Sequence, residues 1–412
     1  MRVLYITAEV PWPLQSGYLR HFHIMRGLSE RHEVTLLSLT RRDSLSDEAS
    51  EVLGSFLSEL EVVSHHEGGR RSRMGKAERL VARRRAARRL ATRVRERLAG
   101  GAHDVVLFSG KDTFPAMQAV GETPVVVDVC DAASLRIRGQ LEVAGAARRP
   151  ALGARLAEVR RVERRLAEAT SHLLFASERD RTAVIGAGAG GRVVPNAVDL
   201  DYWTRSTPAT PDVAPRVVLT GVMDYPPNHD AAMRLAERIM PRVRDEVGEA
   251  ELVIAGRDPG PELRAAGEAR PWMTVTGALP DLRPEMERSA VYCAPLRFAS
   301  GIQNKLLEAL AMQVPVVTTP VVADGIRADG VNPPMIIADA DEAIAAGVVR
   351  LLTEPADHRR LAAEGRAFVE DAFSWPQTVA TVERELADAT AGPPAVPGLM
   401  AAAATTPEAV TL

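Results

Sequence analysis

The segment best suited to bind a ligand is a glycine-containing loop followed by a helix with a lysine and a glutamate. It reads VYCAPLRFASGIQNKLLEALAMQ, and its apolar spacing predicts a buried strand over Val291–Ala294 and a helix over Ile302–Met312. Gly301, Lys305 and Glu308 then share one helix face at i, i+4 and i+7, while the leucines face the core. We therefore expect a polar helix face at the carboxyl end of a strand.

This arrangement suits a nucleoside diphosphate. Loop amides and the helix dipole favour an anion, and Lys305 adds a positive charge in the first turn, where the dipole by itself prefers an acid. A bound phosphate would explain this lysine, and Glu308 can accept two hydrogen bonds from a ribose diol. The alternative is that Lys305 and Glu308 form a surface i,i+3 ion pair of little energetic weight.

A second loop before a helix follows the first strand. The sequence VLYITAEVPWPLQSGYLRHFHIMRGL predicts a strand over Val3–Thr7, a loop with Gly17 and a helix over Leu19–Leu28. Open α/β sheets bind ligands at the carboxyl ends of strands, so free amides at this helix N-terminus suit a phosphate or sugar oxygen. A single glycine is not G-x-G-x-x-G, so a dinucleotide fingerprint is not supported. The alternatives are a plain turn glycine, and packing roles for His21 and His23.

The elements that must position these residues alternate between short apolar strands and amphipathic helices, a pattern typical of βαβ units and parallel sheets. Two series of six strands are predicted, which makes two α/β halves that meet near Asp199–Ala214. The first series is Val3–Thr7, Val34–Leu39, Val105–Phe108, Val125–Val129, His172–Ala176 and Arg192–Val194. The second series is Val217–Thr220, Leu252–Ala255, Val275–Thr276, Val291–Ala294, Val316–Thr318 and Met335–Ala338.

The composition excludes several classes of protein. The 412 residues carry 51 Lys+Arg against 54 Asp+Glu, and a formal net charge of −3 gives no global reason to expect nucleic acid as a partner. Two cysteines build no disulfide framework, and no apolar run approaches the roughly 20 residues that cross a bilayer. The N-terminus lacks a signal-peptide pattern, so we expect a cytoplasmic protein. The basic residues include only three lysines, Lys76, Lys111 and Lys305, which draws attention to each of them.

Two basic segments and the tail stand apart from this pattern. Thirteen basic residues against two acidic ones occupy 70–97, in a helical pattern that keeps one face apolar, with Leu80, Val81, Ala87, Leu90, Val94 and Leu98. This helix is interpreted either as a surface for anionic lipid or an anionic acceptor, in peripheral contact with a membrane, or as a solvated helix face. A second basic helix, Arg148–Arg165, has interleaved acids and is interpreted as scaffold. The tail after Ala391 is expected to be disordered.

Several of these segments resemble a known family. The sequence PLRFASGIQNKLLEALAMQVPVVTT, with LTGVMDYPPNHDAA, LVIAGRDPGPEL and VTGALPD before it and VVPNAVDLDYW near the middle of the chain, resembles glycosyltransferases of family 4. The resemblance is closest to the branch that carries G-I-Q-N-K-x-L-E-A and is associated with polysaccharide and glycoconjugate assembly. It extends over Met1–Phe373, with the specific motifs in the second half.

The resemblance implies an α/β protein of the GT-B fold, in which two Rossmann-like doubly wound parallel-sheet domains face a central cleft. The expected domains are an N-terminal acceptor-binding domain over 1–200 and a C-terminal nucleotide-sugar-binding domain over 201–373. A helix over 374–390 is expected to cross back to the N-terminal domain, and 391–412 to be a disordered tail. The reaction is expected in the cleft, with domain closure excluding water.

The family's donor-site residues carry over with departures. Glu308 corresponds to the second acid of E-x7-E and is expected to hold the ribose, whereas Ser300 stands at the first acid and carries no charge. The usual diphosphate-binding Arg and Lys are absent, with Asn228 or Pro227 in place of the lysine, so Lys305 is the best remaining diphosphate partner. The predicted donor-binding residues, including loop amides and a base pocket, are Gly221, Arg257, Thr276, Gly277, Leu279, Ser300, Gly301, Ile302, Gln303, Asn304, Lys305 and Glu308.

The acceptor site is less well marked. Where many family members have a histidine after the fourth strand, this chain has Phe108-Ser109-Gly110-Lys111. Asp131, just past the next strand, is the leading candidate for activating the acceptor, although a solvated or helix-capping role is the alternative. Asp128 is interpreted as structural or as a hydrogen-bond partner of the acceptor, and Ser177-Glu178 borders the same edge. The predicted acceptor-binding residues are Gly17, Tyr18, His21, Ser109, Asp128 and Asp131.

The resemblance implies a retaining glycosyltransferase that moves a hexose-type sugar from a nucleotide-diphosphate sugar, with UDP favoured, to a hydroxyl of a glycan, glycolipid or small natural product. Asp131 and Lys305 are the predicted catalytic residues, and neither a metal nor a cofactor is expected. Replacing Lys305 or Glu308 with Ala is expected to abolish transfer with little change in melting temperature. The alternatives are a catalytically silent binding or partner subunit, and a nucleotide-sugar epimerase or phosphorylase of the same fold.

Overall fold

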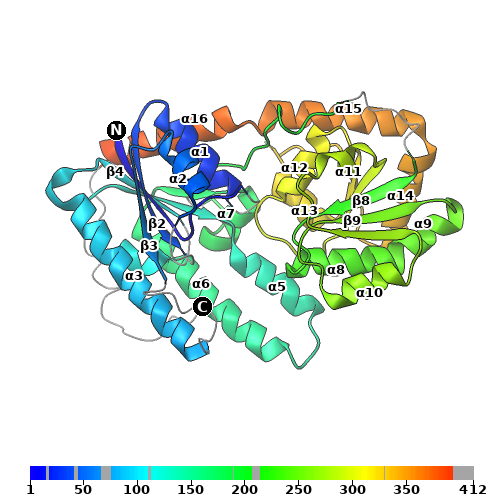
Figure 1. Ribbon diagram of the computed structural model, residues 1–412, viewed down its shortest axis with the longest axis horizontal. Helices are drawn as coiled ribbons and strands as arrows, with labels where there is room; N and C mark the ends of the chain where they lie inside the picture. The colour runs from blue at the N-terminus through cyan, green and yellow to red at the C-terminus, as the bar shows by residue number, and fades with distance from the viewer. Residues whose placement is uncertain are drawn as a thin grey trace. The chain divides into compact units, whose positions relative to one another are not determined.

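The computed structural model describes residues 1–14, 18–40, 45–65, 76–109, 113–188, 190–206, 214–328 and 330–392 (Figure 1). The chain forms two compact units. Unit 1 comprises Met1–Pro195 together with the chain from Trp375 onward, and unit 2 comprises Asn196–Ser374. The first boundary between the units therefore lies after Pro195, whereas the predicted N-terminal domain extends to residue 200. No helix within the described ranges combines the length and apolar character that a membrane crossing requires.

Unit 1 is built on a parallel sheet of seven strands in the described part of the chain, in the order β3-β2-β1-β4-β5-β6-β7. Their bounds are β1 Arg2–Thr7, β2 Glu33–Thr40, β3 Glu59–Ser64, β4 Val105–Ser109, β5 Val125–Cys130, β6 Leu173–Phe175 and β7 Arg192–Val193. The central strands are continuous buried apolar runs, as expected for a sheet covered on both faces. Strand β3 is not among the predicted strands, because this edge strand reads ELEVVS and buries only Val63.

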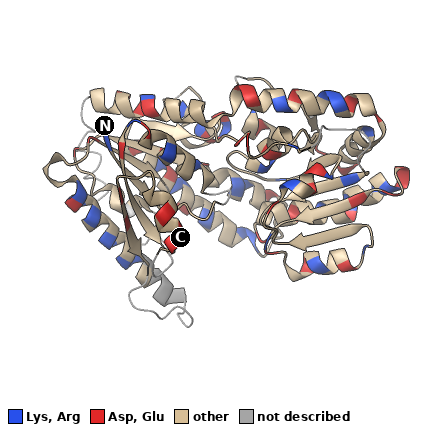
Figure 2. Ribbon diagram, turned by 45° about the horizontal axis from the view of Figure 1, so that its top comes forward, with Lys and Arg blue, Asp and Glu red and all other residues tan. Residues whose placement is uncertain are grey.

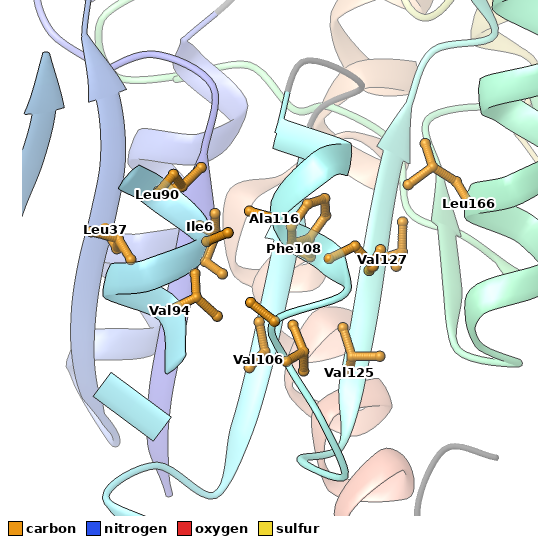
Figure 3. Packing of buried hydrophobic residues seen from close by; sticks show 14 of the residues in the cluster. Ile6, Leu37, Leu90, Val94, Val106, Phe108, Ala116, Val125, Val127 and Leu166 are labelled. Atoms are coloured by element: carbon orange, nitrogen blue, oxygen red, sulfur yellow. The ribbon is translucent and has the colours of Figure 1, made fainter. Parts of the chain in front are cut away.

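Helices cover both faces of this sheet. They are α1 Leu19–Ser29, α2 Asp47–Gly54, α3 Lys76–Leu98, α4 Phe114–Met117, α5 Ala133–Val143, α6 Arg149–Ala169, α7 Glu178–Ile185 and α16 Trp375–Ala391, with a 3-10 turn η1 over Ala99–Gly101. One core cluster joins the sheet to α3, α4 and α6, with Leu90, Ala116 and Leu166 pointing to the strands (Figure 3). The cluster on the other face joins it to α1 and α16.

The apolar face predicted for the basic helix α3 is correct over most of its described length. Leu90 and Val94 are fully buried, Ala87 is buried, and Leu98 packs against the same cluster. Val81 is the exception, because 48% of its surface is exposed one turn before the helix meets the sheet. The side chain of Leu80 and the backbone before Lys76 lie outside the described residues.

Helix α16 is fixed to unit 1 by packing and by charge. Val379 lies so close to α1 that a Cβ added to Gly27 would be 2.6 Å from it, and Val382 is fully buried. The Glu383 carboxylate accepts hydrogen bonds from Arg31, and the distance from Arg31 Nη2 to Glu383 Oε2 is 2.6 Å. The close approach at Gly27 therefore lets two helices that are distant in sequence pack with their backbones near one another.

Unit 2 contains a second parallel sheet, of six strands within the described ranges, in the order β10-β9-β8-β11-β12-β13. The strands are β8 Arg216–Thr220, β9 Glu251–Ala255, β10 Met273–Gly277, β11 Val291–Ala294, β12 Val316–Thr318 and β13 Ile336–Ile337. The order reverses between β8 and β11. In open sheets of this type ligands bind at such a switch point, beyond the carboxyl ends of the strands.

The helices of unit 2 complete a doubly wound α/β architecture. They are α8 Pro226–Arg234, α9 Met240–Glu246, α10 Pro261–Glu268, α11 Arg283–Glu287, α12 Asn304–Ala311, α13 Pro320–Ala323, α14 Asp341–Thr353 and α15 Pro355–Ala372, with a π-helical turn η3 over Leu235–Ile239 and a 3-10 turn η4 over Asp324–Ile326. The predicted α/β class with two Rossmann-like parallel sheets is confirmed. The predicted tail lies outside the described residues beyond 392.

Candidate functional site

The loops at the carboxyl edge of the unit 2 sheet are tied to one another through their backbones. The Met223 amide donates to the Arg257 carbonyl at 2.8 Å, and the Gly256 amide donates to the Gly277 carbonyl at 3.2 Å. Gly256 has a φ of +153°, and a Cβ built there would lie 1.7 Å from the Gly221 carbonyl oxygen. Glycine at this position is required because two loops cross in contact.

We expect Gly256→Ala to destabilise the protein by about 2–3 kcal/mol, since the added methyl group meets backbone that cannot move aside without breaking these hydrogen bonds. The measurement is the free energy of unfolding by urea. Gly248→Ala is the matched control, because a Cβ there has no heavy atom within 4 Å. Equal stability of the two variants would contradict the close loop contact.

The loop before α12 is buried, and the helix begins later than the sequence predicts. Ser300 is 5% exposed and Ile302 is 8% exposed, while Gly301 has a φ of +61°. The helix starts at Asn304, so Gly301 does not lie on a helix face with Lys305 as predicted. The physical reason is that a left-handed glycine turn interrupts the helical path. The side chain of Gln303 donates to the Ser300 carbonyl at 3.0 Å, which stabilises this turn.

Lys305 is a buried amine at this edge. It is 9% exposed and donates a hydrogen bond to Oδ1 of Asn228, whose own amide donates to the Val222 carbonyl at 2.9 Å. Burial lowers the pKa of Lys305 to about 7, and the charge of Glu308 offsets part of this effect. Asn228 is one of the two residues expected at the position of the family's lysine, and the Lys305 amine reaches it from another helix.

Glu308 follows one turn later on α12 and is partly exposed. Burial raises its pKa to about 7, against the opposite effect of Lys305. Burial is the main reason why the pKa of the Tyr292 hydroxyl is raised, and the charge of Glu308 adds a smaller effect in the same direction. The Tyr292 hydroxyl lies 3.0 Å from Thr220 Oγ1. Within the described ranges no hydrogen bond to the Glu308 carboxylate is found, so its oxygens are available to accept bonds from a ligand.

The residues predicted for the base pocket lie at neighbouring strand ends. Thr276 donates to the Gly277 carbonyl at 2.8 Å, and Leu279 is partly exposed. Tyr202, which is not among the predicted residues, is 43% exposed and has the Arg283 guanidinium 4.0 Å from its ring centre. Its pKa is raised, mainly by burial and by Asp281, with a smaller effect of Glu308. In the sequence Tyr202 is marked only by the aromatic pair at the end of VDLDYW, and such a pair is as typical of packing residues as of a binding site.

Two of the predicted acceptor-site residues lie together in unit 1. His21 on α1 has Nδ1 2.9 Å from the Tyr5 hydroxyl and Nε2 3.4 Å from Ser109 Oγ. Burial lowers the pKa of His21 to about 4, so its ring is neutral at physiological pH. Cys130, which the sequence analysis did not select, lies 3.6 Å from the same serine and has a φ of +60°. These side chains line the carboxyl ends of β1, β4 and β5.

Asp128 is part of a buried ion pair. It is 1% exposed, and its oxygens accept bonds from Arg20 at 2.7 and 3.0 Å, while Arg20 also donates to the Val194 carbonyl at 2.7 Å. Burial alone would raise the pKa of Asp128, but Arg20 lowers it below the usual value. Of the two interpretations of Asp128, this geometry favours the structural one. Arg20 was missed because an arginine in an amphipathic helix is normally expected on the surface.

The remaining predicted acceptor residues are less fully defined. Asp131 is partly exposed directly after β5, and its charge contributes to the raised pKa of Asp180, for which burial is the main cause. Tyr18 is the residue before α1 and is partly exposed. Gly17 and Lys111 lie outside the described residues. Within the described ranges no group of His, Cys, Asp and Glu side chains could hold a metal ion, and metal-independent chemistry remains a prediction.

The comparison with known families concerns unit 2. Residues 214–354 match the family model of the glycosyl transferases group 1. The matched region lies within unit 2. That region contains the crossing glycine loops and the pair of Lys305 and Glu308, and together with the fold it supports a glycosyltransferase. Among the curated proteins, none matches this sequence.

Several solved structures share the fold of this chain. HepE from Anabaena, in complex with UDP and glucose, is 14% identical with a TM-score of 0.66, over 94% of this chain and 100% of that chain. Sucrose-phosphate synthase from Thermosynechococcus elongatus is 13% identical with a TM-score of 0.71, over 95% and 100%. A UDP-forming trehalose-phosphate synthase from Burkholderia xenovorans is 10% identical with a TM-score of 0.67, over 94% and 99%. At these identities the likeness shows the fold.

Proposed function

We propose that the protein transfers a hexose-type sugar from a nucleotide-diphosphate sugar to a hydroxyl of an acceptor, with retention of configuration. The acceptor oxygen forms a bond to the anomeric carbon, while the bond from that carbon to the diphosphate oxygen breaks. The nucleoside diphosphate leaves with the electron pair, and the hydroxyl proton passes to the departing phosphate or to a protein base. No metal or cofactor is part of this proposal.

The observation that carries the proposal is the pair of Lys305 and Glu308 at the carboxyl edge of the unit 2 sheet. A buried amine and a partly buried carboxyl are costly to maintain, and groups with pKa values shifted in this way are typical of functional sites. We assign Lys305 and the backbone amides around Ser300–Gln303 to the diphosphate, and Glu308 to the ribose hydroxyls. A cation and amides aimed at the leaving group stabilise the charge that develops there.

The donor is assigned as a UDP-sugar. HepE is described with UDP and glucose, and the trehalose-phosphate synthase as UDP-forming. Tyr202 and Arg283 present a flat, partly exposed surface that could stack a base near Glu308. The test is thermal-shift screening against UDP, GDP, TDP and ADP. Stabilisation by UDP above the others supports the assignment, and a larger shift with GDP, TDP or ADP would replace it.

Unit 1 is assigned to the acceptor, with Asp131 as the group that activates the hydroxyl and His21 and Ser109 as its contacts. Asp131 is the more exposed of the two aspartates at this strand end, and Asp128 is occupied by Arg20. The comparison of Asp131→Asn with Glu51→Gln, an exposed acid on α2 of the same unit, tests this assignment. A normal kcat in Asp131→Asn would remove Asp131 from the catalytic role.

We expect the affinity for UDP-glucose to be highest near pH 7. The pKa of Lys305 is lowered to about 7 and that of Glu308 raised to about 7. Below pH 7 Glu308 gains a proton and no longer accepts both ribose bonds, while above pH 7 Lys305 loses the charge that attracts the diphosphate. Kd measured by calorimetry across this range checks the profile. In Lys305→Met the affinity should only rise with pH, because only Glu308 still titrates. An affinity of the wild type that does not change with pH would contradict the assignment.

A catalytically silent binding subunit is the second candidate. Ser300, buried and uncharged, stands where the family has its first acid, so it offers the donor sugar a hydroxyl in place of a charged group. Detection of sugar transfer, or of UDP-sugar hydrolysis, decides for the enzyme. Binding of UDP-glucose without turnover, over a panel of hydroxyl acceptors, decides for the silent subunit. Turnover without an acceptor that yields an epimer would identify an epimerase instead.

A further inference from the structure

Two long arginine-rich helices, α3 and α6, cover the same face of the unit 1 sheet. Leu90 and Val94 of α3 and Val162 and Leu166 of α6 belong to a single buried cluster on that face (Figure 3). The apolar sides of both helices are therefore used by the protein core. Their polar sides face away from it, and blue segments recur along both in Figure 2. We refer to this surface as the α3–α6 face.

Six exposed arginines of the α3–α6 face have no acidic partner in the described part of the chain, although α6 also carries the buried Glu163 as well as Glu158 and Glu168. Arg84, Arg88 and Arg95 lie along one stripe of α3, at i, i+4 and i+11, and all three are exposed. In α6 the exposed arginines are Arg160, Arg161 and Arg164. Within the described ranges none of these six side chains forms an ion pair.

Acids near α3 do not cancel this charge. Glu61 on the edge strand β3 accepts hydrogen bonds from Arg93 and Arg97, and Glu59 pairs with Arg97. Glu96 pairs with Arg93 at 2.6 Å. These acids therefore neutralise a different set of arginines. The positive charge is local, because the whole chain has a formal net charge of −3.

The chemistry of this surface is that of exposed guanidinium groups on two helices. Arginine binds phosphate through two parallel hydrogen bonds, so a plane of phosphodiester headgroups is a matching partner. Neither helix contains an aromatic residue, which removes the stacking on which binding of single-stranded nucleic acid depends. Because their apolar sides are buried, the helices cannot insert into lipid as interfacial amphipathic helices do, so the contact is ionic. Val81, 48% exposed beside Arg84, is the apolar exception.

We propose that the α3–α6 face docks unit 1 on a bilayer that contains anionic phospholipid. The contact is peripheral and electrostatic, and it places the protein where a lipid-linked acceptor would be available. This proposal does not depend on the donor assignment, since it involves no residue of unit 2. It extends the earlier interpretation of the basic segment by adding α6, whose sequence suggested a scaffold helix.

The test is co-sedimentation of the full chain with vesicles of phosphatidylcholine, with and without phosphatidylglycerol. We expect binding only to the anionic vesicles at about 0.1 M salt, and its loss at about 1 M salt, where charges are screened beyond about 3 Å. The variant Arg84→Gln/Arg88→Gln/Arg95→Gln should bind about 100-fold more weakly, since each arginine near an anionic surface contributes about fivefold. The charge-conserving variant with Lys at the same three positions should retain most of the binding.

The matched control removes three arginines elsewhere. Arg26 on α1 and Arg384 on α16 lie on the helices that cover the opposite face of the sheet, and Arg359 lies in unit 2; all three are exposed. Arg26→Gln/Arg359→Gln/Arg384→Gln should bind within about threefold of the wild type. Equal losses in the two triple variants would overturn the proposal, as would equal binding to neutral vesicles. Tighter binding to polyphosphate or single-stranded DNA than to anionic vesicles would assign the face to a soluble polyanion instead.

Discussion

Replacement of Glu308 by Gln is expected to lower kcat/KM for a UDP-sugar about 1,000-fold. Glutamine has the volume of glutamate, so the packing of α12 is retained. Its amide nitrogen donates where the ribose hydroxyls need an acceptor, and one of the two hydrogen bonds becomes a mismatch in a partly buried place. Steady-state kinetics with saturating acceptor measure the loss, and thermal unfolding shows whether the fold is unchanged.

Glu268→Gln is the control for this variant. Glu268 is an exposed glutamate on α10 of the same unit, so the substitution removes the same charge away from the loop before α12. Its kinetic constants should equal those of the wild type. If Glu308→Gln also had normal kcat/KM, Glu308 would not bind the ribose, and the proposed donor site would have to be moved.

Replacement of Lys305 by Met is expected to reduce turnover about 1,000-fold and to raise the melting temperature near pH 7. Methionine fills the space of the lysine stem but supplies no charge for the departing diphosphate. The stability effect has a definite sign. Because the pKa of Lys305 falls from 10.5 unfolded to about 7 folded, stability is lost as pH falls from the first value towards the second. The methionine variant avoids that loss, so its free energy of unfolding near pH 7 should be higher than that of the wild type by about 1–4 kcal/mol.

Leu307→Met is the control for this second variant, because Leu307 is fully buried on the same helix and carries no polar atom. It should retain activity and lose a little stability. A Lys305→Met protein with full activity would show that Lys305 does not bind the diphosphate. A lowered melting temperature at pH 7 would show that its hydrogen bond to Asn228 stabilises the fold more than burial of the amine destabilises it. The expectation that the melting temperature scarcely changes on replacement of Lys305 is thereby refined.

Local patterns predicted the parts of the site that lie close together in the chain. The i,i+3 spacing of Lys305 and Glu308 on an amphipathic helix located the polar pair, and the structure places both on α12. The same patterns did not predict that α12 starts at Asn304, because helix propensity alone does not show that Gly301 takes a left-handed conformation. They also missed β3, which is an edge strand without an apolar run.

Contacts between distant residues could not be predicted in this way. Lys305 meets Asn228, 77 residues earlier, because β11 and β8 are neighbours in the sheet and the loops that follow them share one edge. Arg20 meets Asp128, 108 residues later, in the core of unit 1. Hydrophobic periodicity records whether a position is buried, but not which strands are adjacent, so the partner of a buried polar group is not encoded locally.

The sequence by itself determined the α/β class and all strands of the two series except β3, because apolar spacing and turn residues act over a few positions. The residues assigned to a nucleoside diphosphate stay a prediction. The tertiary structure decided the rest. Burial, which depends on the whole fold, is what shifts the pKa values of Lys305 and Glu308 towards neutrality. Sheet order, which is set by long-range packing, brings α3 and α6 to one face and turns two basic sequences into one surface.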